Sequence, residues 1–130
     1  LEEWEHNEIC KVVLIAPAVE STTAIDSFFR FLKLSPGVRK EFDSLLQAKS
    51  GHAPGWFSIS RIAPLLKARV LWFQDKDDLM TPLKDVLPIM DKKFPNFQFI
   101  ISEGLGHRRI YRDNKTFKAI LAFFSTPGVS

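Results

Sequence analysis

Residues 69–82 read RVLWFQDKDDLMTP, and this stretch decides the fold class. Its first five residues, Arg69–Phe73, are mostly apolar and β-prone, which favours a strand buried on both faces. The polar segment QDKDDLMTP follows and predicts a loop. Thr81 suits the N-cap of a helix and Pro82 suits its first position. The stretch therefore predicts a strand, a polar loop and a helix in succession.

The same alternation continues on both sides of this stretch. Upstream, residues 11–19 (KVVLIAPAV) predict another strand buried on both faces, which Pro17 ends because proline cannot donate to a central ladder. Downstream, Phe97–Ser102 (FQFIIS) predicts a third strand, and residues 104–107 (GLGH) predict a tight loop. Asp113 is predicted to cap a final helix.

Four segments have the apolar spacing of amphipathic helices. Their predicted inward faces are Ile25, Phe28, Phe29 and Leu32; Val38, Phe42, Leu45 and Leu46; Leu83, Val86, Leu87 and Met90; and Phe117, Ile120, Leu121 and Phe124. Strands that alternate with helices indicate a parallel sheet with right-handed crossovers, and buried parallel strands need cover on both faces. We therefore predict a three-layer α/β fold, a parallel sheet with flanking helices, in which the first strand keeps an open edge.

Composition limits the classes of protein to which the chain can belong. It has 130 residues, of which 45% are hydrophobic and 25% charged, as expected for one soluble globular domain rather than a disordered segment. No apolar run approaches the roughly 20 residues of a membrane helix. The net charge of +3 is too small to indicate nucleic-acid binding, and the single Cys10 excludes an internal disulfide framework. We expect no nucleic-acid partner, no membrane partner, no metal and a cytoplasmic location.

The chemically notable side chains lie directly after the second and third predicted strands. Asp75, Asp77 and Asp78 follow the second strand, and His107 follows the third between flexible glycines. Because working residues in open α/β sheets lie beyond the carboxyl ends of the strands, adjacent strands can bring an Asp and His107 together. A carboxylate that accepts from a histidine fixes its tautomer and stabilises its protonated form. A solvated turn of aspartates and a simple loop histidine are the alternatives.

These motifs resemble the α/β-hydrolase family. VLWFQDKDDLMTP looks like the family's acid loop, in which an Asp lies four residues before a proline, although Gln74 stands where histidine is usual. FIISEGLGHRRI looks like the last strand and its histidine loop, and KVVLIAPAV resembles the strand after the nucleophile helix. The resemblance implies that Asp78 is the catalytic acid and His107 the catalytic base. It also places a lid or cap insertion at about residues 20–60.

The resemblance implies the C-terminal half of an α/β-hydrolase fold spanning residues 1–130. The intact enzyme is then expected to hydrolyse ester, amide or similar acyl bonds of a small-molecule substrate, without an organic cofactor. No G-x-S-x-G nucleophile motif occurs, and the chain opens with Leu1 rather than Met. We therefore expect the nucleophile upstream of Leu1 and no turnover from this chain alone. Trp56, Met80 and Arg108 are the candidate substrate-binding residues, with Trp56 equally suited to the core of a small cap.

A second hypothesis comes from another class of protein. The chain also fits a non-catalytic α/β interaction module that dimerises through the exposed edge of its first strand. Under either hypothesis we expect a homodimer or a swapped assembly that covers this edge. The distance from the Asp78 carboxylate to the His107 ring discriminates the two, because a value of about 2.6–3.2 Å favours the hydrolase.

Overall fold

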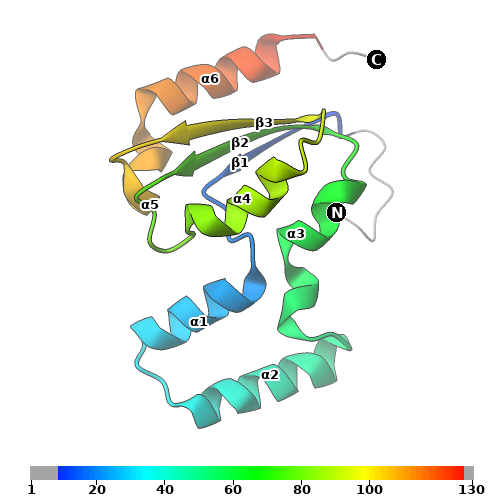
Figure 1. Ribbon diagram of the computed structural model, residues 1–130, viewed down its shortest axis with the longest axis vertical. Helices are drawn as coiled ribbons and strands as arrows, with labels where there is room; N and C mark the ends of the chain where they lie inside the picture. Colours follow the sequence, from blue (N-terminus) through cyan, green and yellow to red (C-terminus); the bar gives the residue numbers. More distant parts are fainter. Residues whose placement is uncertain (1–8, 128–130) are drawn as a thin grey trace.

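The computed structural model describes residues 9–127 and shows an α/β fold built on a three-stranded parallel sheet (Figure 1). The strands are β1 (Lys11–Ile15), β2 (Arg69–Asp75) and β3 (Phe97–Ser102), in the order β1-β2-β3. β2 is therefore central, and its last residue, Asp75, is paired in register with Ser102, the last residue of β3. Leu1, on which the expectation of an upstream segment partly rests, lies outside the described residues.

Helices cover both faces of the sheet, which confirms the predicted parallel sheet with flanking helices. The longer helices are α1 (Ser21–Phe31), α2 (Pro36–Ser50), α4 (Leu83–Asp91) and α6 (Asn114–Ser125). The shorter ones are η1 (Pro54–Phe57), α3 (Ile59–Ile62), η2 (Ala63–Leu65), α5 (Gly106–Arg109) and η3 (Ile110–Arg112). Figure 1 shows α6 over one face of the sheet, and α3 and α4 over the other. In the described part of the chain, no helix combines the length and apolar composition that crossing a membrane requires.

The core lies on both faces of β2. Successive side chains of a strand point to opposite faces, so Trp72 packs with Val86 on the α4 side, and Phe73 packs with Phe123 on the α6 side. Both strand residues are almost completely buried, as predicted for a central strand.

The prediction for the first strand was wrong in two respects. β1 ends at Ile15 and is only half-buried, because it is an edge strand with a neighbour on one side.

The predicted inward face of the last helix was also wrong in part. Asp113 caps α6 as expected, and its carboxylate accepts from the Thr116 amide at 2.8 Å. However, Phe123 packs into the core, whereas Phe117, Leu121 and Phe124 are exposed. The helix carries apolar residues nearly all round, so the spacing alone did not select the buried side.

The first and last elements of the described chain are joined by a lysine. Lys11, the first residue of β1, donates from Nζ to the carbonyl of Phe123 at 2.7 Å and also to that of Thr126. These carbonyls lie at the C-terminus of α6, where a cation is favoured. The lysine therefore holds α6 against the edge strand.

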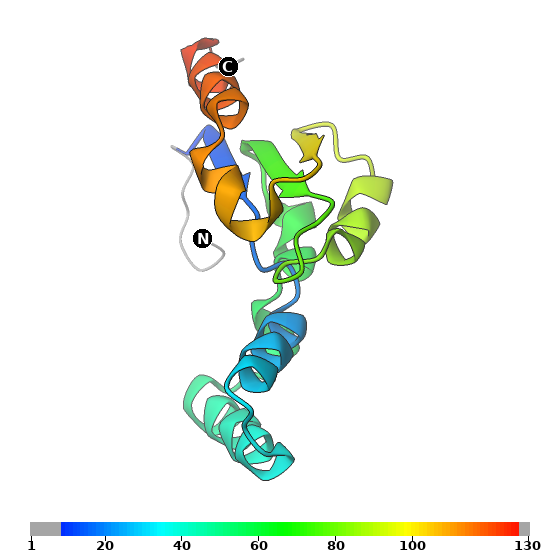
Figure 2. The same cartoon turned by 90° about the vertical axis from the view of Figure 1, so that its left-hand side faces the viewer.

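Residues 20–58 leave the sheet layers as an arm that carries α1 and α2 (Figure 2). The two ends of the arm meet at a neck. There the Ile59 amide donates to the Val19 carbonyl at 2.8 Å, and the Ser21 amide donates to the buried hydroxyl of Ser58 at 3.0 Å. The arm coincides with the segment that was predicted to be a lid or cap.

The arm buries little of its apolar surface, which corrects the predicted inward faces of its two helices. Phe29 is the buried residue of α1, and its ring meets that of Phe42 at 5.5 Å between centroids. Phe28 and Leu32 of the α1 stripe are exposed, as are Val38, Phe42 and Leu45 of the α2 stripe. The reason is position, because both helices extend away from the sheet and pack on η1 and, through the rings of Phe29 and Phe42, on each other.

Candidate active site

The Asp78 carboxylate is fully enclosed by the turn that follows β2. Oδ1 accepts from the amides of Met80 and Thr81, both at 2.9 Å. Oδ2 accepts from the Thr81 hydroxyl at 2.7 Å. The prediction that Thr81 caps the next helix was wrong, because α4 begins at Leu83 and the Thr81 hydroxyl is used on Asp78.

A buried glutamine fixes the far end of this turn. The amide of Gln74 donates to the Thr81 carbonyl at 2.5 Å, and its carbonyl accepts from the Trp72 indole at 3.4 Å. Gln74 was predicted to begin a polar loop but belongs to β2 and is fully buried. A side chain that both donates and accepts can hydrogen-bond to both of these neighbours, so the buried amide leaves neither its donor nor its acceptor unsatisfied.

His107 faces Asp78 from the neighbouring strand's loop. Its Nδ1 lies 2.8 Å from Asp78 Oδ2 and 3.3 Å from the Thr81 hydroxyl. The imidazole side chain is 24% exposed, so it is held from one side and open on another. With a carboxylate at Nδ1, the neutral ring carries its proton there and presents Nε2 as the basic nitrogen. The sequence reasoning that adjacent strands bring an Asp and His107 together agrees with this geometry.

Two glycines with positive φ shape the loop that carries His107. Gly104 has φ +81° and Gly106 has φ +62°, a region that side chains other than hydrogen disfavour. The predicted tight loop is therefore present, but its end is already helical, since α5 begins at Gly106. Asp77, which is exposed, accepts from the Gly104 amide at 2.7 Å and ties this loop to the turn between β2 and α4 that carries Asp78, here called the acid turn.

Asp75 is a second buried carboxylate, and the sequence reasoning had left it between a catalytic group and a solvated residue. It accepts from the Ser102 hydroxyl at 2.6 Å and from the amides of Asp77, Leu105 and Gly106 at 2.9–3.1 Å. Burial alone raises the pKa of the Asp75 carboxyl, but these hydrogen bonds, led by that of Ser102, outweigh it and hold the pKa below its ordinary value. The signal in the sequence was that Asp75 lies two residues after one predicted strand and Ser102 ends the next.

Tyr111 joins the site to the end of β1. Its hydroxyl donates to the Ile15 carbonyl at 3.1 Å, and its ring meets the His107 ring edge-on at 5.6 Å between centroids. Burial, and after it the negative charge of Asp78, raises the pKa of the phenol. Tyr111 is therefore a donor at this site, and no feature of the sequence pointed to it.

The candidate substrate-binding residues are distributed unevenly. Met80 and Arg108 are exposed and lie beside Asp78 and His107 in the chain. Trp56 instead belongs to η1 in the arm, where its ring stacks on His52 at 3.9 Å and lies 3.5 Å from the Arg61 guanidinium. Among residues 9–127, the ring contacts of Trp56 are with His52 and Arg61 and not with His107.

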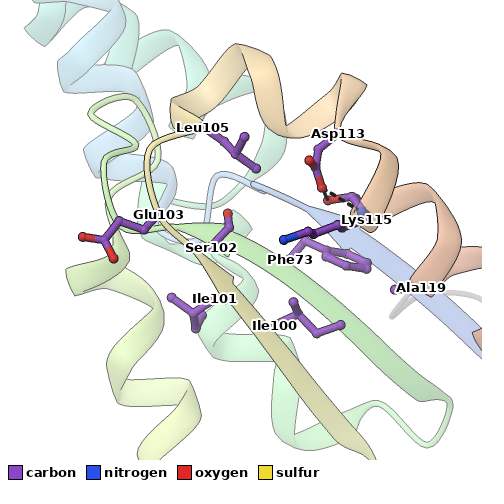
Figure 3. A pocket seen from close by; sticks show the side chains of 10 residues that line it. Phe73, Ile100, Ile101, Ser102, Glu103, Leu105, Asp113, Lys115 and Ala119 are labelled. Carbon is purple, nitrogen blue, oxygen red and sulfur yellow. Dashed lines mark hydrogen bonds between the residues drawn. The ribbon is translucent and has the colours of Figure 1, made fainter.

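A cavity of about 360 Å³ lies elsewhere, between β3 and α6 (Figure 3). Phe73, Ile100 and Ala119 form its apolar walls, and the Lys115 ammonium reaches over them. Neither Asp78 nor His107 lines it, so this cavity is separate from the site built around the imidazole.

Among residues 9–127, the candidate site brings together an acid and a base but no nucleophilic serine. In the part of the chain that the structure describes, the His107 ring hydrogen-bonds to Asp78 and Thr81 and to no serine. Within the same residues, no three His, Cys, Asp or Glu side chains converge as a metal site. What the arrangement can do is accept a proton at Nε2 from a group supplied to it. No protein-family model, curated protein or solved structure matches the chain.

Proposed function

We propose that the chain is the C-terminal half of an α/β-hydrolase and supplies the acid and base of a Ser-Asp-His triad. The observation that carries the proposal is the 2.8 Å contact between His107 Nδ1 and Asp78 Oδ2. This distance falls in the range for a productive acid–base pair, and Asp78 is enclosed so that its charge acts on the ring rather than on water.

The chemistry follows from the orientation of the ring. A serine hydroxyl attacks the acyl carbon while His107 Nε2 takes its proton, and Asp78 stabilises the imidazolium without itself becoming protonated. The imidazolium then returns the proton to the leaving alcohol or amine, and water repeats the cycle on the acyl-enzyme. The two backbone donors on Asp78 Oδ1 and the Thr81 hydroxyl on Oδ2 keep the carboxylate fixed in position throughout.

The nucleophile that the proposal requires is expected at the edge of β1. The open edge of β1 offers unpaired backbone groups to a further parallel strand, which is where we expect the strand carrying the serine to add. The C-terminal end of β1 is already linked to the site, since Tyr111 binds the Ile15 carbonyl. The exposed side chains of Leu79 and Met80 give the acid turn an apolar rim suited to an acyl group.

The first experiment tests the acid–base pair in this chain. Proton NMR should show a low-field resonance for the His107 Nδ1–H. A proton held between imidazole and carboxylate exchanges slowly with water, and its short hydrogen bond moves the chemical shift downfield. Asp78→Asn should abolish it. Asp113→Asn is the matched control, because it changes a helix-capping carboxylate at another place and should leave the resonance intact. A chain without this resonance, or Asp78→Asn that retains it, contradicts the proposal.

The second experiment tests turnover. Joined to an N-terminal segment that carries a G-x-S-x-G elbow, the chain should hydrolyse a p-nitrophenyl ester, and Asp78→Asn should lower the kcat of that protein by about 10⁴, as in other triads. Undiminished turnover of this variant would refute the assignment of Asp78. The 130-residue chain by itself should release no burst of p-nitrophenol.

The alternative proposal, a non-catalytic interaction module, is favoured by a different observation. The arm exposes Phe31 and Leu45 and the last helix exposes Leu121, all apolar side chains more than half accessible, while among residues 9–127 no strand pairs with the outer edge of β1. A module of this kind uses the β1 edge to pair with a second copy. It predicts a dimer whose stability is unaffected by Asp78→Asn.

A further inference from the structure

Asp75 is a buried charge that does not touch the reacting groups. It ends β2, three residues before Asp78, and its side chain is fully enclosed. Three of its four donors come from the β3 side of the site: the Ser102 hydroxyl and the amides of Leu105 and Gly106. The fourth is the Asp77 amide, from the acid turn itself.

The four donors require a carboxylate rather than any other side chain of the same shape. Oδ1 accepts from the amides of Asp77 and Gly106, and Oδ2 accepts from the Ser102 hydroxyl and the Leu105 amide. The three amides can only donate, since a backbone N–H has no acceptor capacity. An asparagine side chain would place its own NH₂ against at least one of these amides in either orientation. Two acceptor oxygens with four lone-pair sites match the demand.

These hydrogen bonds let Asp75 control the position of His107. Leu105 and Gly106 are the two residues before His107, and Gly106 begins the helical turn that presents the ring. The Nδ1 to Oδ2 distance of 2.8 Å leaves little tolerance, because a shift of about 1 Å takes the pair beyond hydrogen-bond range. The same carboxylate also accepts from the Asp77 amide in the acid turn, so one side chain holds both the turn that carries Asp78 and the loop that carries His107.

We propose that Asp75 is a positioning residue that clamps the acid turn and the histidine loop together through one buried carboxylate. The inference rests on the proposed function for its purpose, but the clamp is a property of this chain and can be measured without catalysis. Its signature is that loss of the Asp75 charge frees the amides of Leu105 and Gly106 and misplaces the His107 ring, while β2 and β3 remain paired.

The test uses the 130-residue chain and two variants. In Asp75→Asn, hydrogen exchange at the Leu105 and Gly106 amides should become roughly 10- to 100-fold faster, the scale of a lost hydrogen bond to a charged group. The His107 Nδ1–H resonance should disappear as well. Ser102→Ala removes one donor and keeps the carboxylate with its three amides, so it should give a smaller acceleration, below about tenfold, with the resonance retained.

Two further variants separate this inference from general destabilisation and from the proposed function. Asp113→Ala removes a carboxylate that also accepts from a backbone amide and a threonine hydroxyl, at 2.8 and 3.1 Å, and it should leave both readouts unchanged. Asp78→Asn should abolish the resonance without freeing the Leu105 and Gly106 amides. A folded Asp75→Asn with the resonance intact, or with exchange no faster than in Asp113→Ala, overturns the inference. If Asp75→Asn does not fold, unaltered exchange in Ser102→Ala overturns it instead. A chain that lacks the resonance refutes the proposed function, and amide exchange in Asp75→Asn still decides the clamp.

Discussion

Replacement of Thr81 by valine tests how the acid is held. Valine has nearly the same shape but no hydroxyl, so Thr81→Val removes the 2.7 Å hydrogen bond to Asp78 Oδ2. A hydrogen bond to a charged group contributes about 1.5–3 kcal/mol. Because Oδ2 keeps His107 and Oδ1 keeps two amides, we expect a loss near the lower end, about 1.5 kcal/mol. For a domain of this length that corresponds to a Tm lowered by roughly 5 °C.

The assay is thermal unfolding at pH 7, followed by circular dichroism. Thr116→Val is a matched control, because Thr116 also donates its hydroxyl, at 3.1 Å, to an aspartate three residues earlier, and that aspartate, Asp113, caps α6 instead of holding the histidine. Both variants should lose similar stability, but only Thr81→Val should move the His107 Nδ1–H resonance, to lower field, since His107 becomes the sole donor on Oδ2. A Thr81→Val chain as stable as the original, beside a destabilised Thr116→Val, would refute this account of the turn.

Three further predictions concern the loop, the buried charge and the open edge. Gly106→Ala should cost about 1–2 kcal/mol in urea unfolding because its φ is +62°, whereas Gly55→Ala, with open space around it, should be close to neutral; equal effects would contradict the role of φ. The lowered pKa of Asp75 means that its contribution to stability is complete above its ordinary pKa of about 4 and is lost as the pH falls through the folded-state value. The free energy of unfolding should therefore fall below about pH 4, and Asp75→Asn should flatten that slope; an unchanged slope would show that other carboxyls carry it. Light scattering should give twice the chain mass of 14.9 kDa if the β1 edge is covered by a second copy, and a monomer at high concentration counts against that assembly.

The strands, and the order in which strands and helices alternate, could be predicted from the sequence because the apolar runs are bounded by prolines, glycines and polar turn residues. β3 begins and ends where it was predicted, between Asn96 and Glu103. β2 runs two residues further than predicted, because Gln74 and Asp75 are polar and a polar pair ordinarily marks a loop. Both are buried only because their partners, Thr81 and the residues around Ser102, lie elsewhere in the chain. The residues adjacent to Gln74 and Asp75 in the sequence therefore did not predict that these two side chains are buried.

The pairing of Asp78 with His107 was accessible from sequence for a topological reason. Adjacent parallel strands end at the same edge, so residues after β2 and β3 must meet. The supporting residues were not accessible, since a threonine before a proline equally fits a helix cap, and Tyr111 acts through a single hydroxyl on a backbone carbonyl of β1. The prediction of which helix face is buried was wrong where a helix is apolar on several sides, as α6 is, or extends beyond the sheet, as α2 does.

The neck at the base of the arm has a consequence for how this molecule can change over evolutionary time. The chain departs after Val19 and returns at Ile59, and these two points are already held together by hydrogen bonds. The segment between them begins and ends at the same place. Its length and composition therefore do not affect the strand registers or the position of the imidazole. Insertions, deletions or wholesale exchange of the arm are therefore inexpensive, because lengthening a loop adds little closure entropy. Selection can alter what the arm contacts while the chemistry of the sheet edge is inherited unchanged.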